Sequence, residues 1–411
     1  MSAAERHRQA AARTARPPTG LAARAAVPAA WVSGVAAAAG ALAPAAAEVR
    51  IRRSQRPLTS RWQRLPVADR GRTVLGISFR PRQAEDMGLA PRAALAELLS
   101  YPFGMVRLGA YWDRMEPRPG AFDPGELDWQ VEAAEQAGKQ VIICLGPVKT
   151  FGYPEFFVPG HHLPAPLPEG SLIEPHTHSR LLAAGTAFAT RVVERYAGRA
   201  AVVAWQVEHE AVDPLGLEHS WRLSAGFAAA EVAAVRAADP GRPVVMNGFL
   251  PTSTPVRLMQ WWRSRDQGDS LAVAQRLADI TGLDVYPRHA LAGRGGTAVY
   301  LDGGALPWQR RGWRAAGRWA AAVPGRRVMV AEGQAEPWEA VTSPPSPPDA
   351  AMYSCRPEDV IRNYNHCLHA ARAVPGGLWA YLFWGAEYWL LRRQQGDPSY
   401  LGAVGRILAG G

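Results

Sequence analysis

Lysine and cysteine are scarce in this chain, and the scarcity of cysteine argues against sites built from paired cysteines. Only Lys139 and Lys149 are lysines among 46 basic residues, so arginine supplies nearly all the positive charge. The three cysteines, Cys144, Cys355 and Cys367, show neither metal-ligand spacing nor a disulfide framework. Cys144 lies in the apolar run VIICL, which predicts a buried strand with a packed thiol. A reducing compartment is therefore compatible with the sequence.

A strongly apolar run of about 20 residues, the length that a membrane anchor needs, is also absent. Residues 31–47 (WVSGVAAAAGALAPAAA) are uncharged but dominated by alanine, and they lie far from Met1. A signal peptide would begin with a compact basic start and a leucine-rich core. We predict that residues 1–70 form a disordered Arg/Ala/Pro-rich extension, with a secretion signal, an anchor or a start site annotated too far upstream as alternatives. Cytoplasmic localisation is favoured, and membrane association is expected only through this extension.

The net charge of +10 also belongs mainly to the extension. Residues 1–70 hold twelve arginines against three acidic residues, which accounts for nine of the ten net charges. Residues 71–411 are therefore nearly neutral, and we do not expect the folded domain to bind nucleic acid.

From residue 71 onward, short apolar runs alternate with longer amphipathic segments, a pattern typical of repeated βα units around a parallel sheet. The fold class predicted is α/β, a single (β/α)8 TIM barrel over residues 71–411. The candidate strands are 74–79, 104–108, 140–145, 202–208, 243–247, 280–286, 327–332 and 378–384. The candidate helices include 91–100, 126–137, 180–197, 221–238 and 357–373, with Gly138 capping the second. Long loops follow strands three, five, six and seven, on the face where such barrels carry their active sites.

Glutamates stand at the ends of two apolar strands. The fourth strand leads into Glu208, His209 and Glu210, and the seventh ends in Glu332. A buried carboxylate is costly unless it is paired, so these positions indicate catalysis. Strand alternation places Glu208 and Glu210 on one side, which leaves Glu208 as the alternative to Glu210.

Four segments in this order resemble retaining glycoside hydrolases of the barrel clan that includes cellulases and β-galactosidases. They are VRLGAYWDRMEPRPGAFD, WQVEHEA, AEGQAEPW and LFWGAEYW, and the resemblance spans about residues 74–405. It implies an O-glycosyl hydrolase that cleaves β-linked sugars by double displacement, with Glu332 as nucleophile and Glu210 as acid/base. An oligosaccharide or glycoside is the expected partner, and neither cofactor nor metal is expected. A catalytically inactive barrel that binds glycan or a protein partner is the alternative.

The same resemblance suggests further site residues. Arg107 and Tyr286 match clan positions and would keep Glu332 ionised, and Trp205 would give the acid/base a less polar setting. His209 stands where the clan usually has an asparagine that binds the sugar 2-hydroxyl; histidine can donate the same bond but titrates near neutral pH. Trp384 is expected to form the floor of the site. The other predicted substrate contacts are Tyr111, Trp112 and Glu387, with Trp389 as a further wall.

Several residues keep two interpretations. For His161, His162, His176 and His178, substrate contact or a surface loop is favoured over a metal site, because no HExxH or CxxC pattern is present. Trp261 and Trp262 fit a packed pair better than a sugar platform. Glu336 and Glu387 either line the pocket or pair with arginines. The sugar identity and the oligomeric state are not indicated.

Overall fold

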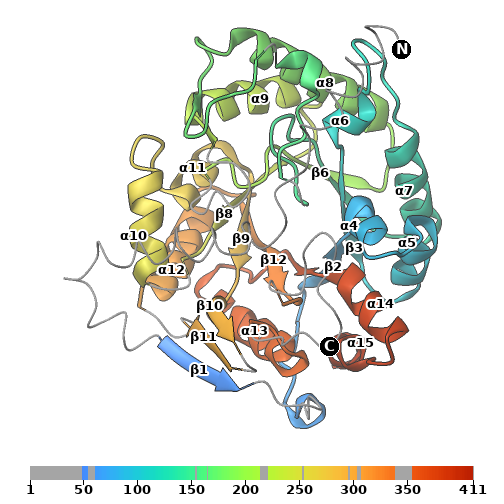
Figure 1. Cartoon of the computed structure of the whole chain (residues 1–411), viewed down its shortest axis with the longest axis vertical. Coiled ribbons are helices and arrows are strands. Elements are labelled where there is room, and N and C mark those ends of the chain that lie inside the picture. The colour runs from blue at the N-terminus through green and yellow to red at the C-terminus, as the bar shows by residue number, and fades with distance from the viewer. Residues whose placement is uncertain are drawn as a thin grey trace, which may run out of the picture.

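The protein is a closed barrel of eight parallel strands surrounded by helices (Figure 1). The computed structural model describes residues 49–53, 61–152, 155–163, 165–212, 221–251, 254–294, 297–302, 307–337 and 354–410. In barrel order the strands are β12 (Arg327–Gln334), β13 (Ala380–Trp384), β2 (Val74–Ser78), β3 (Met105–Gly109), β4 (Gln140–Cys144), β6 (Val202–Gln206), β8 (Val244–Phe249) and β9 (Ile280–Val285). All eight predicted strands and the predicted fold class are confirmed.

The helices of the βα units form the outer layer. They include α4 (Pro81–Asp86), α5 (Pro91–Ser100), α6 (Trp112–Met115), α7 (Gly125–Gln136), α8 (Ser179–Tyr196), α9 (Ala225–Ala238), α10 (Thr254–Arg263), α11 (Ser270–Leu277), α12 (Pro307–Ala322), α13 (Pro357–Ala370), α14 (Ala386–Gln394) and α15 (Ser399–Ala409). Gly138 follows α7 with a φ of 66°, the left-handed backbone expected of a glycine cap.

Two groups of buried side chains make the core. The larger group fills the space between the strands and the helices. The smaller group plugs the barrel interior and consists of Met105, Ile142, Ala204, Val245, Ile280, Met329, Ala331, Ala380 and Leu382. Beyond this plug, toward the carboxyl ends of the strands, the buried side chains become polar, among them Arg107, Gln206, Asn247, Asp284 and Glu332. The barrel therefore presents its polar residues on the face where such folds carry active sites.

Part of the expected N-terminal extension is structured. Strand β1 (Val49–Arg53) pairs antiparallel with β11 (Thr297–Asp302), which pairs with β10 (Arg288–Arg294) to make a three-stranded sheet beside α13 (Figure 1). Residues 61–70 also contact the barrel, since the Tyr364 hydroxyl donates to Ala68 O and Asn365 Nδ2 donates to Pro66 O. The alanine-rich segment 31–47 lies outside the described residues.

Two short strands, β5 (Leu172–Ile173) and β7 (Arg222–Leu223), pair in parallel outside the barrel. A 3-10 helix, η3 (Gly160–His162), lies in the loop between β4 and α8. Among the described helices, none has the length and apolar character that a bilayer crossing demands.

Candidate active site

Glu332 lies in β12, where two donors hold its carboxylate. Arg107 Nη2, from β3, donates to Glu332 Oε1 at 2.6 Å, and the Tyr286 hydroxyl donates to Oε2. Arg107 is fixed in turn by Ser78 Oγ at 2.9 Å and Gln206 Oε1 at 3.1 Å. A guanidinium and a hydroxyl donating to one carboxylate favour its ionised form. The contacts expected of Arg107 and Tyr286 with Glu332 are therefore present.

A β-bulge in β12 aims Glu332 into the barrel. Val330 pairs with Leu283 and Glu332 pairs with Asp284, so Ala331 is an extra residue opposite β9. Ala331 already packs in the barrel interior, and simple alternation would turn the next side chain outward. The bulge resets the alternation, so that the Glu332 side chain also points inward.

The backbone bends sharply after β6, where two glutamates adopt left-handed conformations. Glu208 has a φ of 55° and Glu210 a φ of 44°, the only positive values among the described non-glycine residues. This conformation costs about 1–2 kcal/mol per residue for an L-amino acid. Strain of this kind concentrates at functional sites. Because β6 ends at Gln206, the expected strand alternation does not extend to the two glutamates and is wrong there.

Asn247, from β8, joins the polar groups beyond the plug. Its Oδ1 accepts from the Glu210 backbone N and from Gln206 Nε2, both at 3.0 Å. Its Nδ2 donates to Asp284 Oδ2 at 2.6 Å and lies 3.0 Å from His209 Nδ1. The backbone donor at Glu210 fixes the orientation of the amide, since only its oxygen can accept.

His209 is a buried ring between Asn247 and Glu332. Because the Asn247 nitrogen can only donate, a hydrogen bond between the two requires that His209 Nδ1 accept and that Nε2 carry the proton; the same Nδ1 lies 3.5 Å from Glu332 Oε1. Burial first, then the charges of Lys149 and Arg107, hold the pKa of His209 well below its ordinary value. The ring lies parallel to Trp384, with an interplanar angle of 3° and centroids 6.3 Å apart. In this arrangement the Nε2–H of His209 is available as a hydrogen-bond donor, and the lowered pKa favours the neutral imidazole over the imidazolium.

The carboxyl group of Asp284, in β9, adjoins those of Glu210, which follows β6, and Glu332, in β12. Asp284 hydrogen-bonds Glu210, and it lies opposite Glu332 in the register of β9 and β12. Burial, followed by the charge of Glu332, raises the pKa of Asp284 well above its usual range. Two hydrogen-bonded carboxyls need a proton between them. The site thus combines a carboxylate held by a guanidinium and a hydroxyl with a second carboxyl, that of Asp284, whose pKa is raised.

Glu208 belongs to a different set of contacts. Its carboxylate accepts from Val148 N at 3.0 Å and Lys149 N at 2.7 Å, in the loop after β4. It also interacts with Glu231 of α9, and burial raises the pKa of Glu208 to about 7. Gly146 permits this loop to approach, because a Cβ there would lie 2.6 Å from Glu208 Cα. These contacts favour Glu210 over Glu208 as the residue that faces Asp284.

Trp384 ends β13 and is half-buried, with a cation above its ring. The Arg80 guanidinium lies 4.3 Å from the ring centroid. Arg80 pairs with Glu336 at 2.9 Å and with Glu387 at 2.7 Å. Arg80 donors occupy both oxygens of Glu387, which supports the ion-pair interpretation of this residue and argues against direct substrate contact.

The three aromatic residues expected as subsite walls take packing positions instead. The Tyr111 hydroxyl donates to Phe151 O at 3.1 Å, and Trp389 Nε1 donates to a backbone carbonyl at 2.9 Å. Trp112 is fully buried and stacks on Phe188 with centroids 5.4 Å apart. The burial of these rings does not support the predicted contacts of Tyr111, Trp112 and Trp389 with substrate.

Two further expectations about tryptophans need correction. Trp205 Nε1 donates to Asp239 Oδ2 at 3.1 Å and the ring packs in the outer core, so it faces the helix layer and not Glu210. Trp261 and Trp262, on α10, are 66% and 62% exposed, so they are not a packed pair.

Sequence patterns gave no role to four buried polar residues in or beside the site. Asp284 lies near the end of the apolar strand β9 and Arg80 follows the apolar strand β2, which was a usable signal. Asn247 ends the run VVMN, and Glu231 is a single acid in an alanine-rich helix. Only the folded structure places these four residues beside the site residues that the sequence predicted.

Comparisons with known proteins give a partial family match and a common fold. The family model described as beta-galactosidase (Glyco_hydro_42) matches residues 100–227, about a third of the chain, which include Arg107 and Glu210 but not Glu332. A search of curated proteins found no match.

Among solved structures, GH5_18 from Streptomyces cattleya in complex with GlcNAc has 15% identity and a TM-score of 0.50, covering 82% of this chain and 80% of that one. A variant of GH5_18 in complex with Manb1-4GlcNAc has 15% identity and a TM-score of 0.47, covering 76% and 70%. The exo-beta-1,4-mannosidase Op5Man5 from Opitutaceae bacterium strain TAV5 has 16% identity and a TM-score of 0.47, covering 78% and 55%. At these identities the likeness to GH5_18 concerns the fold. The resemblance to barrel glycoside hydrolases is confirmed, and the family match over residues 100–227 supports a glycosidase.

Proposed function

We propose that this protein is a retaining glycoside hydrolase that cleaves O-glycosidic bonds of β-linked sugars. Glu332 is the nucleophile and Glu210 the general acid/base. The observation that carries the proposal is the setting of Glu332, whose two oxygens accept from Arg107 and Tyr286 at the carboxyl end of the barrel. A nucleophilic carboxylate must be ionised, and this pair of donors favours the ion.

Glu210 has the opposite requirement, since an acid must hold a proton near neutral pH. Its hydrogen bond with Asp284 provides for this, because the two carboxyls cannot both ionise without repulsion. The ionised Glu332 beside Asp284 strengthens the effect, because loss of the shared proton would leave a third negative charge.

The reaction then proceeds in two balanced steps. Glu332 attacks the anomeric carbon, the glycosidic C–O bond breaks, and the leaving oxygen takes the proton of Glu210. Glu210, now ionised, removes a proton from water, whose oxygen attacks the same carbon and releases Glu332. Two inversions retain the configuration. This geometry needs the carboxyl groups about 5–5.5 Å apart.

His209 and Trp384 are the proposed sugar contacts. The Nε2–H of His209 can donate to a sugar hydroxyl, the bond that the clan obtains from asparagine. The Trp384 ring, parallel to His209 and half-buried, offers an apolar face to the C–H groups of a sugar.

Trapping the intermediate tests the proposal. The full-length protein is incubated with a panel of activated 2-deoxy-2-fluoro-glycosides, digested with trypsin and analysed by mass spectrometry. We expect one sugar adduct on Glu332, in the peptide that begins at Val328, and the reactive member of the panel identifies the sugar. An adduct on another residue would overturn the assignment. A protein that reacts with no member and hydrolyses no aryl glycoside would instead be the inactive binding barrel.

Leaving-group dependence tests Glu210 separately. Glu210→Ala should slow hydrolysis about 10²–10⁴-fold for poor leaving groups and much less for a dinitrophenyl glycoside, which needs no protonation. Glu208→Gln is the matched variant, because its carboxyl binds the loop after β4. If Glu208→Gln shows this dependence and Glu210→Ala does not, the acid/base role belongs to Glu208.

A further inference from the structure

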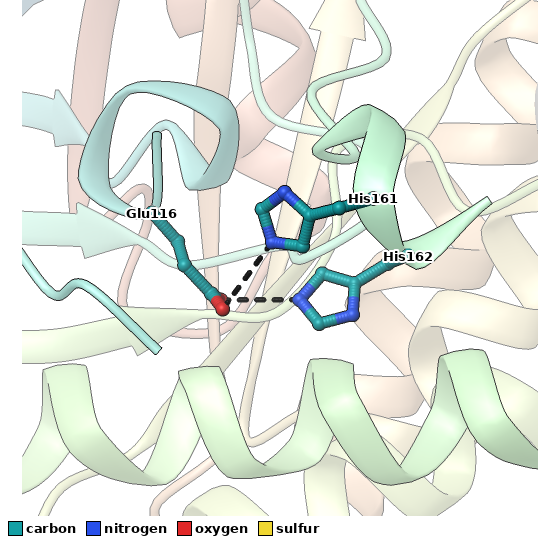
Figure 2. Close-up of side chains that lie close together, drawn as sticks. All are labelled: Glu116, His161 and His162. Carbon is teal, nitrogen blue, oxygen red and sulfur yellow. Dashed lines mark hydrogen bonds and ion pairs between the residues drawn. The ribbon is translucent and has the colours of Figure 1, made fainter. Parts of the chain in front are cut away.

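Two adjacent histidines and a glutamate converge on one point beside the barrel. His161 and His162 belong to η3, and Glu116 follows α6 (Figure 2). His161 Nε2 lies 3.4 Å from Glu116 Oε1, and His162 Nε2 lies 3.2 Å from Glu116 Oε2. The sequence favoured substrate contact or a surface loop for these histidines, and it gave no role to Glu116.

These distances suit metal ligands better than strong hydrogen bonds. A charge-assisted N–H···O bond is usually about 2.7–2.9 Å long. Ligands that each lie about 2.1 Å from a tetrahedral ion are roughly 3.4 Å from one another. The three ligand atoms all lie within 4.8 Å of one another, and both imidazole rings direct Nε2 at the carboxylate (Figure 2).

The carboxylate is oriented by neighbours, as metal-binding carboxylates usually are. Trp112 Nε1 donates to Glu116 Oε2 at 2.7 Å, and Gly120 N donates to Oε1 at 3.0 Å. Trp112 also stacks on His162, with ring centroids 4.6 Å apart. Two of the three ligands are thus fixed before an ion arrives.

Solvent reaches the cluster, so an ion can enter. The side chains of His161 and His162 are 21% and 23% exposed, and that of Glu116 is 12% exposed. No fourth His, Cys, Asp or Glu joins the group within the part of the chain that the structure describes. A water molecule would therefore complete a tetrahedral shell.

We propose that Glu116, His161 and His162 bind one divalent transition-metal ion of the zinc class. Two imidazoles and one carboxylate suit Zn²⁺, whereas Mg²⁺ and Ca²⁺ prefer shells of oxygen alone. The ion would fasten the loop after β4 to the segment after β3, next to the contact in which Asp113 N donates to Phe157 O at 2.9 Å. This proposal is independent of the proposed glycosidase activity.

Calorimetry on metal-stripped, tag-free, full-length protein tests the site. Zn²⁺ should bind with one site per chain and raise the Tm by about 5 °C at a hundredfold excess over Kd. Mg²⁺ at the same concentration should do neither. Glu116→Gln and His162→Ala should each weaken Zn²⁺ binding at least about tenfold. His176→Ala, an exposed histidine of the same loop, is the matched control and should bind as the parent does.

Hydrogen exchange locates the ion and guards against misfolded variants. Zn²⁺ should slow amide exchange in residues 112–122 and 155–163 of the parent and of His176→Ala, but not of Glu116→Gln. If His162→Ala does not fold, His161→Gln replaces it. Absence of saturable Zn²⁺ binding, or unchanged binding in both Glu116→Gln and the histidine variant, would overturn the proposal.

Discussion

Asp284 shows how much of the site depends on one side chain that no motif identifies. It accepts from Asn247 at 2.6 Å, hydrogen-bonds Glu210 and lies opposite Glu332 in the sheet register. It thereby couples the proton of the proposed acid to the charge of the proposed nucleophile. A carboxyl in this position raises the pH at which the last proton leaves the pair.

Replacement of Asp284 by asparagine should therefore change the pH profile. In Asp284→Asn, Glu210 has a neutral neighbour and loses its proton at lower pH. The alkaline limb of kcat/KM should move down by about one pH unit or more. Steady-state kinetics on an aryl glycoside between pH 4 and 9 measures the shift.

Thr281→Val is the matched control for this experiment. Thr281 is buried in the same strand but does not titrate, so its replacement should leave the limb in place. An unmoved limb in Asp284→Asn, or an equal shift in both variants, would contradict the coupling.

At the same scale, the sequence predicted the carboxylates and the donors to Glu332, but not the backbone that aims them. The sequence predicted Arg107, Tyr286 and Glu332 because each stands at the polar end of an apolar strand. The extra residue at Ala331 is invisible in a run such as VMVAE, because a bulge depends on the pairing with β9. The left-handed backbone of Glu208 and Glu210 likewise depends on contacts with β8 and with the loop after β4.

Among the elements, helix α10 is the clearest departure from expectation. It belongs to the long connection between β8 and β9 and presents Trp261 and Trp262 to solvent. For these two residues the sequence favoured a packed pair, since an aromatic side chain in a barrel usually packs in the core. Their exposure does not support the packed pair, and the alternative, a sugar platform, stays a prediction.

Stability measurements can check the exposure of this pair. Trp261→Ala combined with Trp262→Ala should change the free energy of unfolding by no more than about 0.5 kcal/mol, because little area becomes uncovered. Trp313→Ala, in α12, should cost about 3–5 kcal/mol, because that ring is 2% exposed. Urea unfolding followed by circular dichroism compares them. A loss above about 1 kcal/mol in the double variant would restore the packing interpretation.

Barrel strands were easier to predict than the additional sheet. Parallel strands are buried on both faces and appear as continuous apolar runs, so all eight were located. The sheet of β1, β11 and β10 joins segments about 250 residues apart, and its strands contain several arginines. No local pattern indicates such a pairing.

For the molecule as a whole, the buried pair of Glu208 and Glu231 links stability to pH. Burial raises the pKa of Glu208 to about 7, and burial and Glu208 raise that of Glu231 well above its usual value. Both values exceed the ordinary 4.5 of an exposed glutamate, so the folded state holds more protons than the unfolded chain above that pH. This contribution is complete below about pH 4.5 and is lost as the pH rises through 7.

Glu231→Gln should reduce this loss. A neutral amide can still donate to Glu208, so the Tm of the variant relative to the parent should rise between pH 5 and 8. The effect should be of the order of 3 kcal/mol at most. Differential scanning calorimetry measures it, with Glu194→Gln on the exposed face of α8 as control. A constant difference across this range would show that the pair does not titrate there.

The antiparallel pairing of β1 with β11 has a practical consequence for trimming the chain. A boundary at residue 71, which composition suggests, removes the outer strand of this sheet. The backbone N–H and C=O groups of β11 that bond β1 would then form an open edge, to which a strand of another molecule could add. A shortened protein made for crystallisation is thus better begun before Val49, where its own strand protects it from self-association.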